Sequence, residues 1–162
     1  YINKQKQNIP VHNWTPAKVT KKSVWKPTSM LVEEFMHTDL FTVRKNDILE
    51  LAIDIIDWNK LRYLPVEDDK GHLVGILSTR HILRHFRKNG SNKKEVIVKE
   101  LCKNDPVCVD PQTTIMEAIE LMEKEKVPCL PVTKNKKLVG LIEESNFLDI
   151  SRSLFKRLAK SE

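Results

Sequence analysis

The chain repeats itself, and this repeat constrains its fold more than any other feature of the sequence. A shift of 66 residues places Leu64-Pro65-Val66 on Leu130-Pro131-Val132. After one residue is lost in a polar turn, a shift of 65 places Leu73-Val74-Gly75 on Leu138-Val139-Gly140. Matches in this order with one deletion indicate an internal duplication, and therefore two copies of one supersecondary unit.

Each copy carries the same succession of strand and helix signals. Copy one has an extended stretch that ends at Val43, a helix-capping signal at Asp47-x-x-Glu50, two short apolar runs joined by a turn, and a helix near 79–87. Copy two repeats this order, with a capping signal at Thr114-x-x-Glu117 and a last helix near 144–158. The signals predict a β-α-β-β-α unit twice, in an α/β fold of the α+β type.

Helical spacing of apolar residues predicts which helix faces are buried. In copy one the expected inner face of the first helix comprises Ile48, Leu51, Ala52, Ile55 and Ile56. In the last helix it comprises Phe147, Ile150, Leu154, Phe155 and Leu158.

The basic character of the chain is confined to its first part. Residues 1–29 contain six lysines and no acidic residue, so they account for the whole formal net charge of +6. Together with the prolines there, this composition predicts an extended arm or linker rather than a folded unit. The predicted organisation is an arm, a first repeat, a linker, a second repeat and a tail, at residues 1–30, 31–88, 89–96, 97–158 and 159–162.

Several classes of protein are excluded or disfavoured. The longest apolar run, Leu138–Ile142, is far shorter than the roughly 20 residues of a membrane-spanning helix. The three cysteines show no C-x-x-C spacing, which predicts reduced thiols in a cytoplasmic protein. His81 and His85 have metal-ligand spacing but lie among lysines and arginines, so we expect no metal site. No familiar catalytic motif occurs, so we expect no enzyme activity.

In their order and spacing, the duplicated Leu-Pro-Val and Leu-Val-Gly motifs resemble those of tandem CBS domains. The resemblance covers about residues 31–158. It implies a compact Bateman module with two facing sheets, pseudo-two-fold symmetry and two clefts between the copies. It also implies a regulatory, non-catalytic role, a homodimer, and a ligand such as AMP, ADP, ATP or S-adenosylmethionine. The lack of an initial methionine and the linker-like residues 1–29 predict an attached N-terminal domain.

The resemblance implies a ligand signature after each Leu-Val-Gly motif. Ligand-binding members carry Ser or Thr, then two residues, then Asp, whose carboxylate accepts hydrogen bonds from the ribose hydroxyls. Copy one keeps Ser78 but has His81 in place of Asp. Copy two has Glu143 in place of the hydroxyl residue and Asn146 in place of Asp. Neither copy keeps the ribose carboxylate, and copy one is the more hospitable to phosphate.

The resemblance also implies an adenine pocket just before each Leu-Pro-Val motif. There Tyr63 is placed to stack on a base and Arg62 to pair with a phosphate. The full candidate ligand set is Thr42, Leu61, Arg62, Tyr63, Ser78, Arg80, His81, Cys108, Val127, Pro128, Cys129 and Asn146.

Three interpretations stay open at this point. The first is a sensor that binds an adenine nucleotide weakly or degenerately and controls an attached domain. The second is a structural dimerisation module with vestigial clefts, in which Ser78 is only a helix cap and Tyr63 only packs in the core. The third is a nucleic-acid-associated module acting through the basic arm, although we expect no membrane or nucleic-acid partner.

Overall fold

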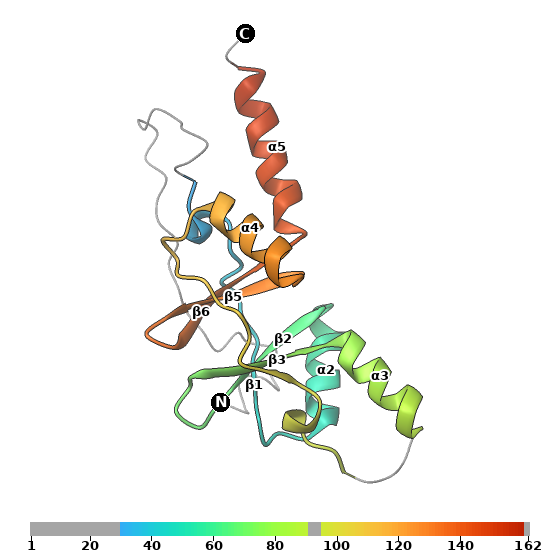
Figure 1. Cartoon of the computed structure of the whole chain (residues 1–162). Helices are drawn as coiled ribbons and strands as arrows, with labels where there is room; N and C mark the ends of the chain where they lie inside the picture. Colours follow the sequence, from blue (N-terminus) through green and yellow to red (C-terminus); the bar gives the residue numbers. More distant parts are fainter. Residues whose placement is uncertain (1–29, 91–94, 161–162) are drawn as a thin grey trace. The chain divides into compact units, whose positions relative to one another are not determined.

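The computed structural model describes residues 30–90 and 95–160 (Figure 1). The predicted arm, except Met30, therefore lies outside the described residues. The helices and strands in chain order are η2 (Val32–Glu34), β1 (Val43–Arg44), α2 (Leu49–Asn59), β2 (Tyr63–Glu67), β3 (Leu73–Ser78), α3 (Thr79–Asn89), η3 (Val98–Glu100), β4 (Lys103–Asn104), α4 (Ile115–Glu125), β5 (Cys129–Lys134), β6 (Lys137–Glu143) and α5 (Asn146–Leu158). The predicted order of a strand, a helix, two strands and a helix is confirmed in copy one. In copy two the first strand is reduced to a single bridge at Val109.

The described residues form two compact units that do not coincide with the two repeats. Unit 1 holds residues 39–90, 95–106 and 135–138, and unit 2 holds residues 30–38, 107–134 and 139–160. The opening segment of each repeat therefore belongs to the unit built mainly from the other repeat.

Backbone hydrogen bonds show that this exchange is reciprocal. In unit 2, the N–H of Val32 donates to the carbonyl of Thr113 over 2.8 Å. In unit 1, the N–H of Val98 donates to the carbonyl of Asp47 over 2.9 Å. Val98 and Asp47 are the repeat equivalents of Val32 and Thr113, so the duplication extends to the exchanged contacts.

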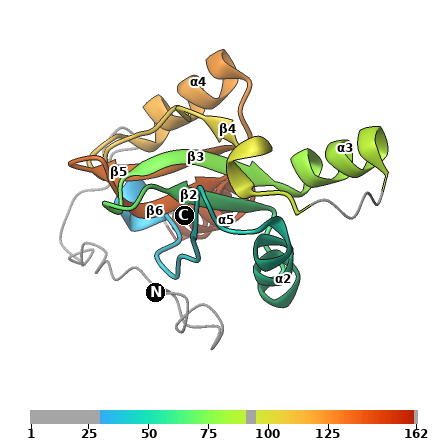
Figure 2. The same ribbon diagram turned by 90° about the horizontal axis from the view of Figure 1, so that it is seen from below.

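Unit 1 is organised around a four-stranded sheet in the order β1-β2-β3-β4. β1 runs parallel to β2, whereas β2 with β3 and β3 with β4 are antiparallel. α2 and α3 bury their apolar faces against this sheet, in a cluster that includes Ile55, Leu64, Leu77 and Ile82. Figures 1 and 2 both show the two helices on the side of the unit opposite to the β2–β3 turn.

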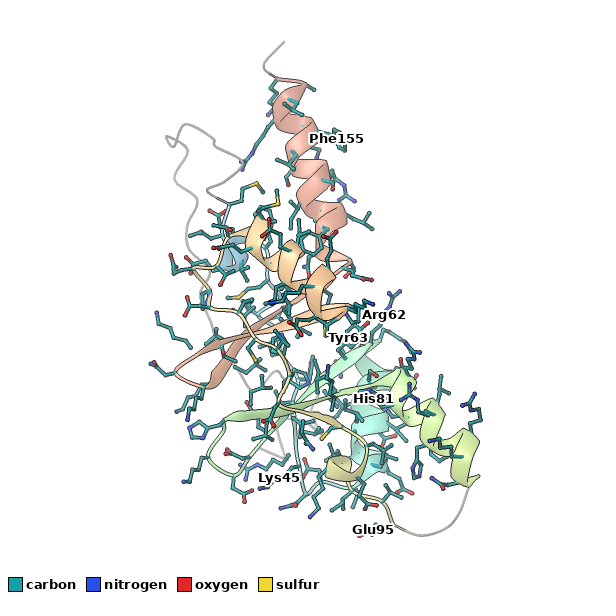
Figure 3. The ribbon with its side chains drawn as sticks, in the orientation of Figure 1. Lys45, Arg62, Tyr63, His81, Glu95 and Phe155 are labelled. Atoms are coloured by element: carbon teal, nitrogen blue, oxygen red, sulfur yellow. The ribbon has the colours of Figure 1, made fainter. Side chains whose placement is uncertain are left out.

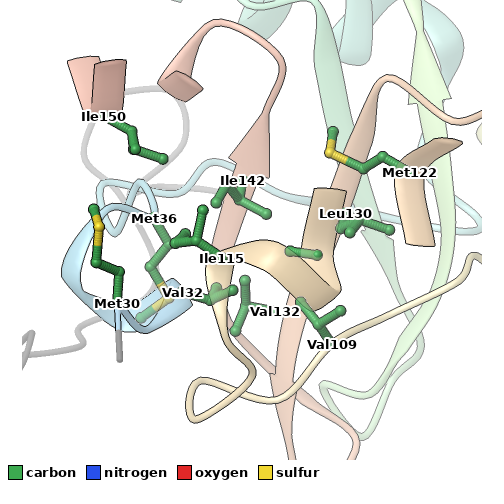
Figure 4. Packing of buried hydrophobic residues seen from close by; sticks show 11 residues of the cluster. Met30, Val32, Met36, Val109, Ile115, Met122, Leu130, Val132, Ile142 and Ile150 are labelled. Carbon is green, nitrogen blue, oxygen red and sulfur yellow. The ribbon is translucent and has the colours of Figure 1, made fainter. Parts of the chain in front are cut away.

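Unit 2 has the same pairing pattern around a smaller sheet. β5 and β6 form a two-stranded sheet, and single bridges join Val109 to Val132 and His37 to Leu141. These bridges occupy the places that β1 and β4 hold in unit 1. Residues 30–38 are the exchanged segment of this unit. Figure 4 shows the core, where Val32 and Met36 of this segment lie among side chains of α4, β5 and β6.

The two predicted capping boxes have different outcomes. In α4 the prediction is confirmed, because the N–H of Glu117 donates to Thr114 Oγ1 over 3.2 Å and the N–H of Thr114 donates to Glu117 Oε2 over 2.9 Å. In α2 the prediction is wrong. Ile48 is the N-cap and makes no side-chain cap bond, while Asp47 Oδ2 accepts from the N–H of Arg44 over 2.7 Å. Asp47 therefore stabilises the turn before the helix rather than the helix end.

Two predicted buried faces also need correction. Ile48 is exposed because it precedes the helix proper. On α5, Ile150 is buried and Phe147 and Leu154 pack against the core, but Phe155 and Leu158 are exposed. Both exposed residues lie in the last turn of α5. Of the described helices, none is long and apolar enough to cross a membrane.

Candidate functional site

Strand pairing brings the copy-one candidates together at one end of the unit 1 sheet. β2 begins at Tyr63, which lies opposite Ser78, the last residue of β3. The N–H of Thr79 donates to the carbonyl of Arg62 over 3.2 Å. Figure 3 shows Arg62, Tyr63 and His81 at this end of the sheet. The base-stacking candidate and the phosphate-binding candidates therefore lie beside one another.

Ser78 serves as the cap of α3. Its Oγ accepts a 3.3 Å hydrogen bond from the backbone N–H of His81, so the helix-cap interpretation is confirmed. A serine hydroxyl carries a proton of its own in addition to its acceptor lone pairs. Ser78 can therefore cap the helix and still donate to an anion, and its capping role does not exclude ligand binding.

His81 lies in a cationic environment on the first turn of α3. Its Nδ1 atom is buried and has no hydrogen-bond partner among the described residues. Burial lowers the pKa of His81, and nearby positive charges lower it further, in the order Arg84, Arg80 and Lys103. The surroundings of His81 therefore carry an excess of positive charge, which disfavours a proton on the imidazole. The same excess of positive charge favours an anionic ligand.

Two other copy-one candidates, Thr42 and Leu61, make structural contacts within unit 1. Thr42 is fully buried and donates from Oγ1 to the buried carboxylate of Glu67 over 3.2 Å. Leu61 follows the end of α2, where its N–H donates to Ile56, and its side chain packs against the core. Both residues have structural roles in this unit, and their proposed ligand contacts stay a prediction.

In unit 2, Asn146 uses its amide to hold the exchanged segment. The side chain is buried, and its Nδ2 donates to the carbonyl of Phe35 over 3.0 Å and lies 3.2 Å from His37 Nε2. Its Oδ1 accepts a 2.7 Å bond from the N–H of Glu143. These contacts engage Nδ2 and one of the two lone pairs of Oδ1, and a ribose contact by Asn146 stays a prediction.

Cys108 lines an open groove of about 470 Å³ between the strand end and α4. Burial raises the pKa of its thiol, and a hydrogen bond with Thr133 partly offsets this effect. Cys108 and Thr133 occupy the repeat positions of Thr42 and Glu67, so the same polar pair recurs with different chemistry. The groove is also lined by three carboxylates, Asp110, Glu117 and Glu120, and by one cation, Lys124, and this excess of negative charge makes it a poor place for a phosphate.

The remaining copy-two candidates precede or begin β5. Val127 and Pro128 are half-buried and Cys129 is buried. The carbonyl of Pro128 accepts from the N–H of Glu144 over 3.0 Å, as that of Arg62 accepts from Thr79 in unit 1. The backbone pairing of the two sheet ends is thus equivalent, but this one carries Glu143 and Glu144 where unit 1 has Ser78 and Thr79.

Sequence reasoning missed Lys103 as a neighbour of His81. Lys103 lies on β4 opposite Ile76, because the opening segment of the second repeat pairs with the sheet of unit 1. The sequence-based division assigned residues 97–158 to one unit and so separated Lys103 from His81. The similar segments 32–36 and 98–102 are the signal for this contact, because each packs in the unit built mainly from the other repeat.

All three cysteines are free thiols, as the sequence predicted. In the part of the chain that the structure describes, no group of three or more His, Cys, Asp or Glu side chains is arranged to hold a metal ion.

Comparison with known proteins defines the class. The family model for the CBS domain matches residues 32–88 and 98–153. The chain belongs to the CBS domain family and carries a tandem pair of these domains, which are non-catalytic regulatory modules.

Individual relatives and structures agree with this family. A CBS domain-containing protein of Dictyostelium discoideum is 29% identical over 131 residues, which cover 75% of this chain and 90% of the relative. The inosine-5'-monophosphate dehydrogenase of Korarchaeum cryptofilum is 33% identical over 111 residues, which are 68% of this chain but 22% of the enzyme. The crystal structure of CBSX2 in complex with AMP matches with a TM-score of 0.67 and 26% identity, covering 77% of this chain and 98% of CBSX2.

Proposed function

We propose that this CBS pair is a regulatory module that senses a phosphate-bearing adenine nucleotide through the end of the unit 1 sheet. The observation that carries the proposal is the cationic surrounding of His81, which combines side chains of α3 and β4. Tyr63 and Ser78 lie side by side at the same sheet end. The structure of CBSX2 with AMP, at 26% identity, supports the choice of an adenine nucleotide.

The charge of unit 1 predicts which nucleotides bind. Arg62, Arg80 and Lys103 are exposed cations that can pair with phosphate oxygens. S-adenosylmethionine carries a positive sulfonium and no phosphate, so these cations repel rather than attract it. AMP and ATP are therefore the expected ligands. Ribose contacts contribute less, because His81 and Asn146 stand where a carboxylate is expected and neither offers its two acceptor oxygens.

Ligand binding would act on an attached or associated domain. The dehydrogenase relative, of which this chain matches 22%, is an example of a CBS pair within a larger enzyme. A nucleotide can shift such a domain only if it binds one conformation of the module better than the other. We further propose that the module works in the cytoplasm.

The module is also proposed to be a homodimer. Leu83 of α3 and Leu148 of α5 occupy equivalent repeat positions and are 69% and 71% exposed. Large apolar side chains exposed at matching places on two helices are typical of an interaction surface rather than of random exposure.

The test is calorimetric titration of the full chain with AMP, ATP and S-adenosylmethionine. A variant carrying Arg62→Ala and His81→Ala should bind AMP at least about tenfold more weakly, because it loses a charge-assisted bond and a group of the site. The matched control carries Arg44→Ala and His72→Ala, which lie at the opposite end of the same sheet. Equal affinities in the two variants would mean that the nucleotide binds elsewhere on the chain, whereas no heat with millimolar nucleotide would leave structural dimerisation as the function.

A further inference from the structure

The groove in unit 2 that Cys108 lines lies outside the proposed nucleotide site, whose residues belong to unit 1. It runs along α4, from Thr113 before the helix to Lys124 in its last turn. Its lining includes Val109, which is buried, and Leu121, which is half-buried. Its volume of about 470 Å³ is within the range in which pockets hold ligands, roughly 300–1,000 Å³. The groove is therefore large enough to receive side chains of another segment.

The groove has an excess of negative charge that its own unit does not neutralise. Its charged residues are Asp110, Glu117, Glu120 and Lys124, and all four are exposed. Among the described residues, no ion pair joins any of these three carboxylates to a cation. Negative charge beside apolar surface fits a cationic segment that also carries a large apolar side chain, because charges set the register while apolar groups are buried.

Residues 1–29 lie outside the described residues, but the point at which they join unit 2 is described. The carbonyl of Met30 accepts a 2.8 Å hydrogen bond from the N–H of Ile115, the first residue of α4. The N–H of Val32 donates to the carbonyl of Thr113, which lines the groove, also over 2.8 Å. In Figure 1 this opening segment, in blue, lies beside α4. The preceding chain therefore enters unit 2 at the end of the groove that Thr113 lines.

The nearest part of that preceding chain has the composition that the groove calls for. Residues 21–26 read Lys-Lys-Ser-Val-Trp-Lys, and residues 1–29 contain no acidic residue. The helix length from Thr113 to Lys124 is about 16 Å at roughly 1.5 Å per residue. At about 3.3 Å per extended residue, position 26 can lie at most about 13 Å from Met30 and position 21 at most about 30 Å from it. Residues 21–26 can therefore reach the whole length of the groove.

We propose that residues 21–26 of the chain's own arm dock in this groove. The indole of Trp25 packs against Val109 and Leu121, and the neighbouring lysines pair with the carboxylates of the groove. Because the segment is tethered at Met30, its effective concentration at the groove is on the order of millimolar, so weak individual contacts are sufficient. A basic segment with one large aromatic side chain thus meets a groove of matching charge, in a unit that does not hold the proposed nucleotide site.

Disulfide trapping tests the docking, because the groove contains the native thiol of Cys108. In the full chain, Val24→Cys places a second thiol beside Trp25. A disulfide forms when both thiols lose their protons and two electrons pass to oxidised glutathione, which is reduced to two glutathione molecules. We expect an intramolecular disulfide between the introduced thiol and Cys108, identified by mass spectrometry of the digested protein. Cys102, a half-buried free thiol of unit 1, is the internal comparison.

A matched pair of charge variants tests why the arm docks. Added to the trapping variant, Glu120→Lys leaves two carboxylates and two cations in the groove, and the rate of disulfide formation should fall at least about fivefold. Glu123→Lys makes the same charge change at an exposed position of α4 that does not line the groove, and its rate should be unchanged. Raising the salt concentration from about 0.05 to about 0.5 M should slow trapping by screening the same attraction.

Three results would overturn the proposal. The first is no disulfide with Cys108, or one formed no faster than that with Cys102. The second is an equal trapping rate in Glu120→Lys and Glu123→Lys, since the charge of the groove would then be irrelevant. The third is a disulfide-linked dimer through Cys108, which would assign the groove to the arm of a second copy. No nucleotide is present in these measurements, so a failed titration with AMP would leave their outcome unaffected.

Discussion

The side chain of Asn146 donates a hydrogen bond from Nδ2 to the carbonyl of Phe35 over 3.0 Å, across 111 positions of the chain. This bond fastens the exchanged segment of residues 30–38 to the junction of β6 and α5. Ligand-binding CBS domains carry Asp at this position, and a carboxylate has no hydrogen to donate to a carbonyl. Asn146 thus makes a structural contact within unit 2, and its predicted ligand contact stays a prediction.

Replacing Asn146 should destabilise unit 2. Asn146→Ala leaves the carbonyl of Phe35 and the N–H of Glu143 without their side-chain partner, and we expect the free energy of unfolding to fall by about 2–3 kcal/mol. The measurement is urea denaturation. As a control, Asn89→Ala removes an exposed amide whose Nδ2 lies 3.2 Å from His85 Nδ1 and should cost less than about 0.5 kcal/mol. Equal losses in the two variants would show that the buried amide has no special role.

Gly140 lets Met36 of the same exchanged segment approach β6. An alanine Cβ at position 140 would lie 2.8 Å from Met36 Cγ, so Gly140→Ala should cost about 1–3 kcal/mol through overpacking. Met36→Ala should cost about 2–5 kcal/mol through the cavity it leaves. Because the new methyl group occupies part of that cavity, the double variant should lose less than the sum.

The matched control for this coupling is Gly75→Ala. A Cβ there would meet Cys102 Sγ at 3.0 Å and the carbonyl of Lys103 at 3.1 Å, in unit 1 rather than unit 2. Its cost should add to that of Met36→Ala without coupling, since the sites share no partner. Additive costs for Gly140→Ala and Met36→Ala would contradict the packing seen here.

Local patterns predicted the helices and strands well because each pattern occurs in both repeats. The N-cap residues were predicted less well, because each depends on one side chain. Thr114 forms its capping box, whereas Asp47, with the same spacing, bonds to the turn before α2. Asp47 lies one residue before the N-cap Ile48, whereas Thr114 is itself the N-cap, and spacing alone does not state which residue takes the cap position.

The candidate site was predicted only where neighbours in sequence are also neighbours in space. Arg62, Tyr63 and Ser78 meet through strand pairing that the hairpin pattern implied. Lys103 and the Asn146–Phe35 bond depend on the reciprocal exchange of opening segments. Periodicity locates strands and helices but does not state which sheet a segment joins, so these contacts could not be derived from it.

The capping box of α4 should make stability depend on pH. Hydrogen bonds from the backbone N–H and then the hydroxyl of Thr114 lower the pKa of Glu117 from its usual value of 4.5. A lowered carboxyl pKa stabilises the folded state above the usual value, and the contribution disappears as pH falls through the lowered pKa. Glu117→Gln should therefore lower the free energy of unfolding near neutral pH. This difference from the unaltered chain should shrink as the pH falls from 5 to about 2. Glu123→Gln, outside the box, is the control; a pH-independent difference for Glu117→Gln would contradict the prediction.

His81 should add a second pH dependence, at higher pH than that of Glu117. Its pKa is lowered by burial and then by Arg84, Arg80 and Lys103, so the unfolded chain binds a proton more readily than the folded one. Stability is therefore highest above the usual value of 6.5 and falls as pH drops through 6.5 to the lowered pKa. His81→Gln should remove this part of the pH dependence in urea denaturation.

The same histidine reports on the proposed ligand. A phosphate placed among these cations neutralises part of their field, so AMP should raise the pKa of His81 toward its usual value. Titration of the imidazole by NMR, without and with saturating AMP, measures this change directly, and His85 on the exposed part of α3 provides an internal comparison. If AMP binds and the pKa of His81 does not rise, the phosphate lies elsewhere.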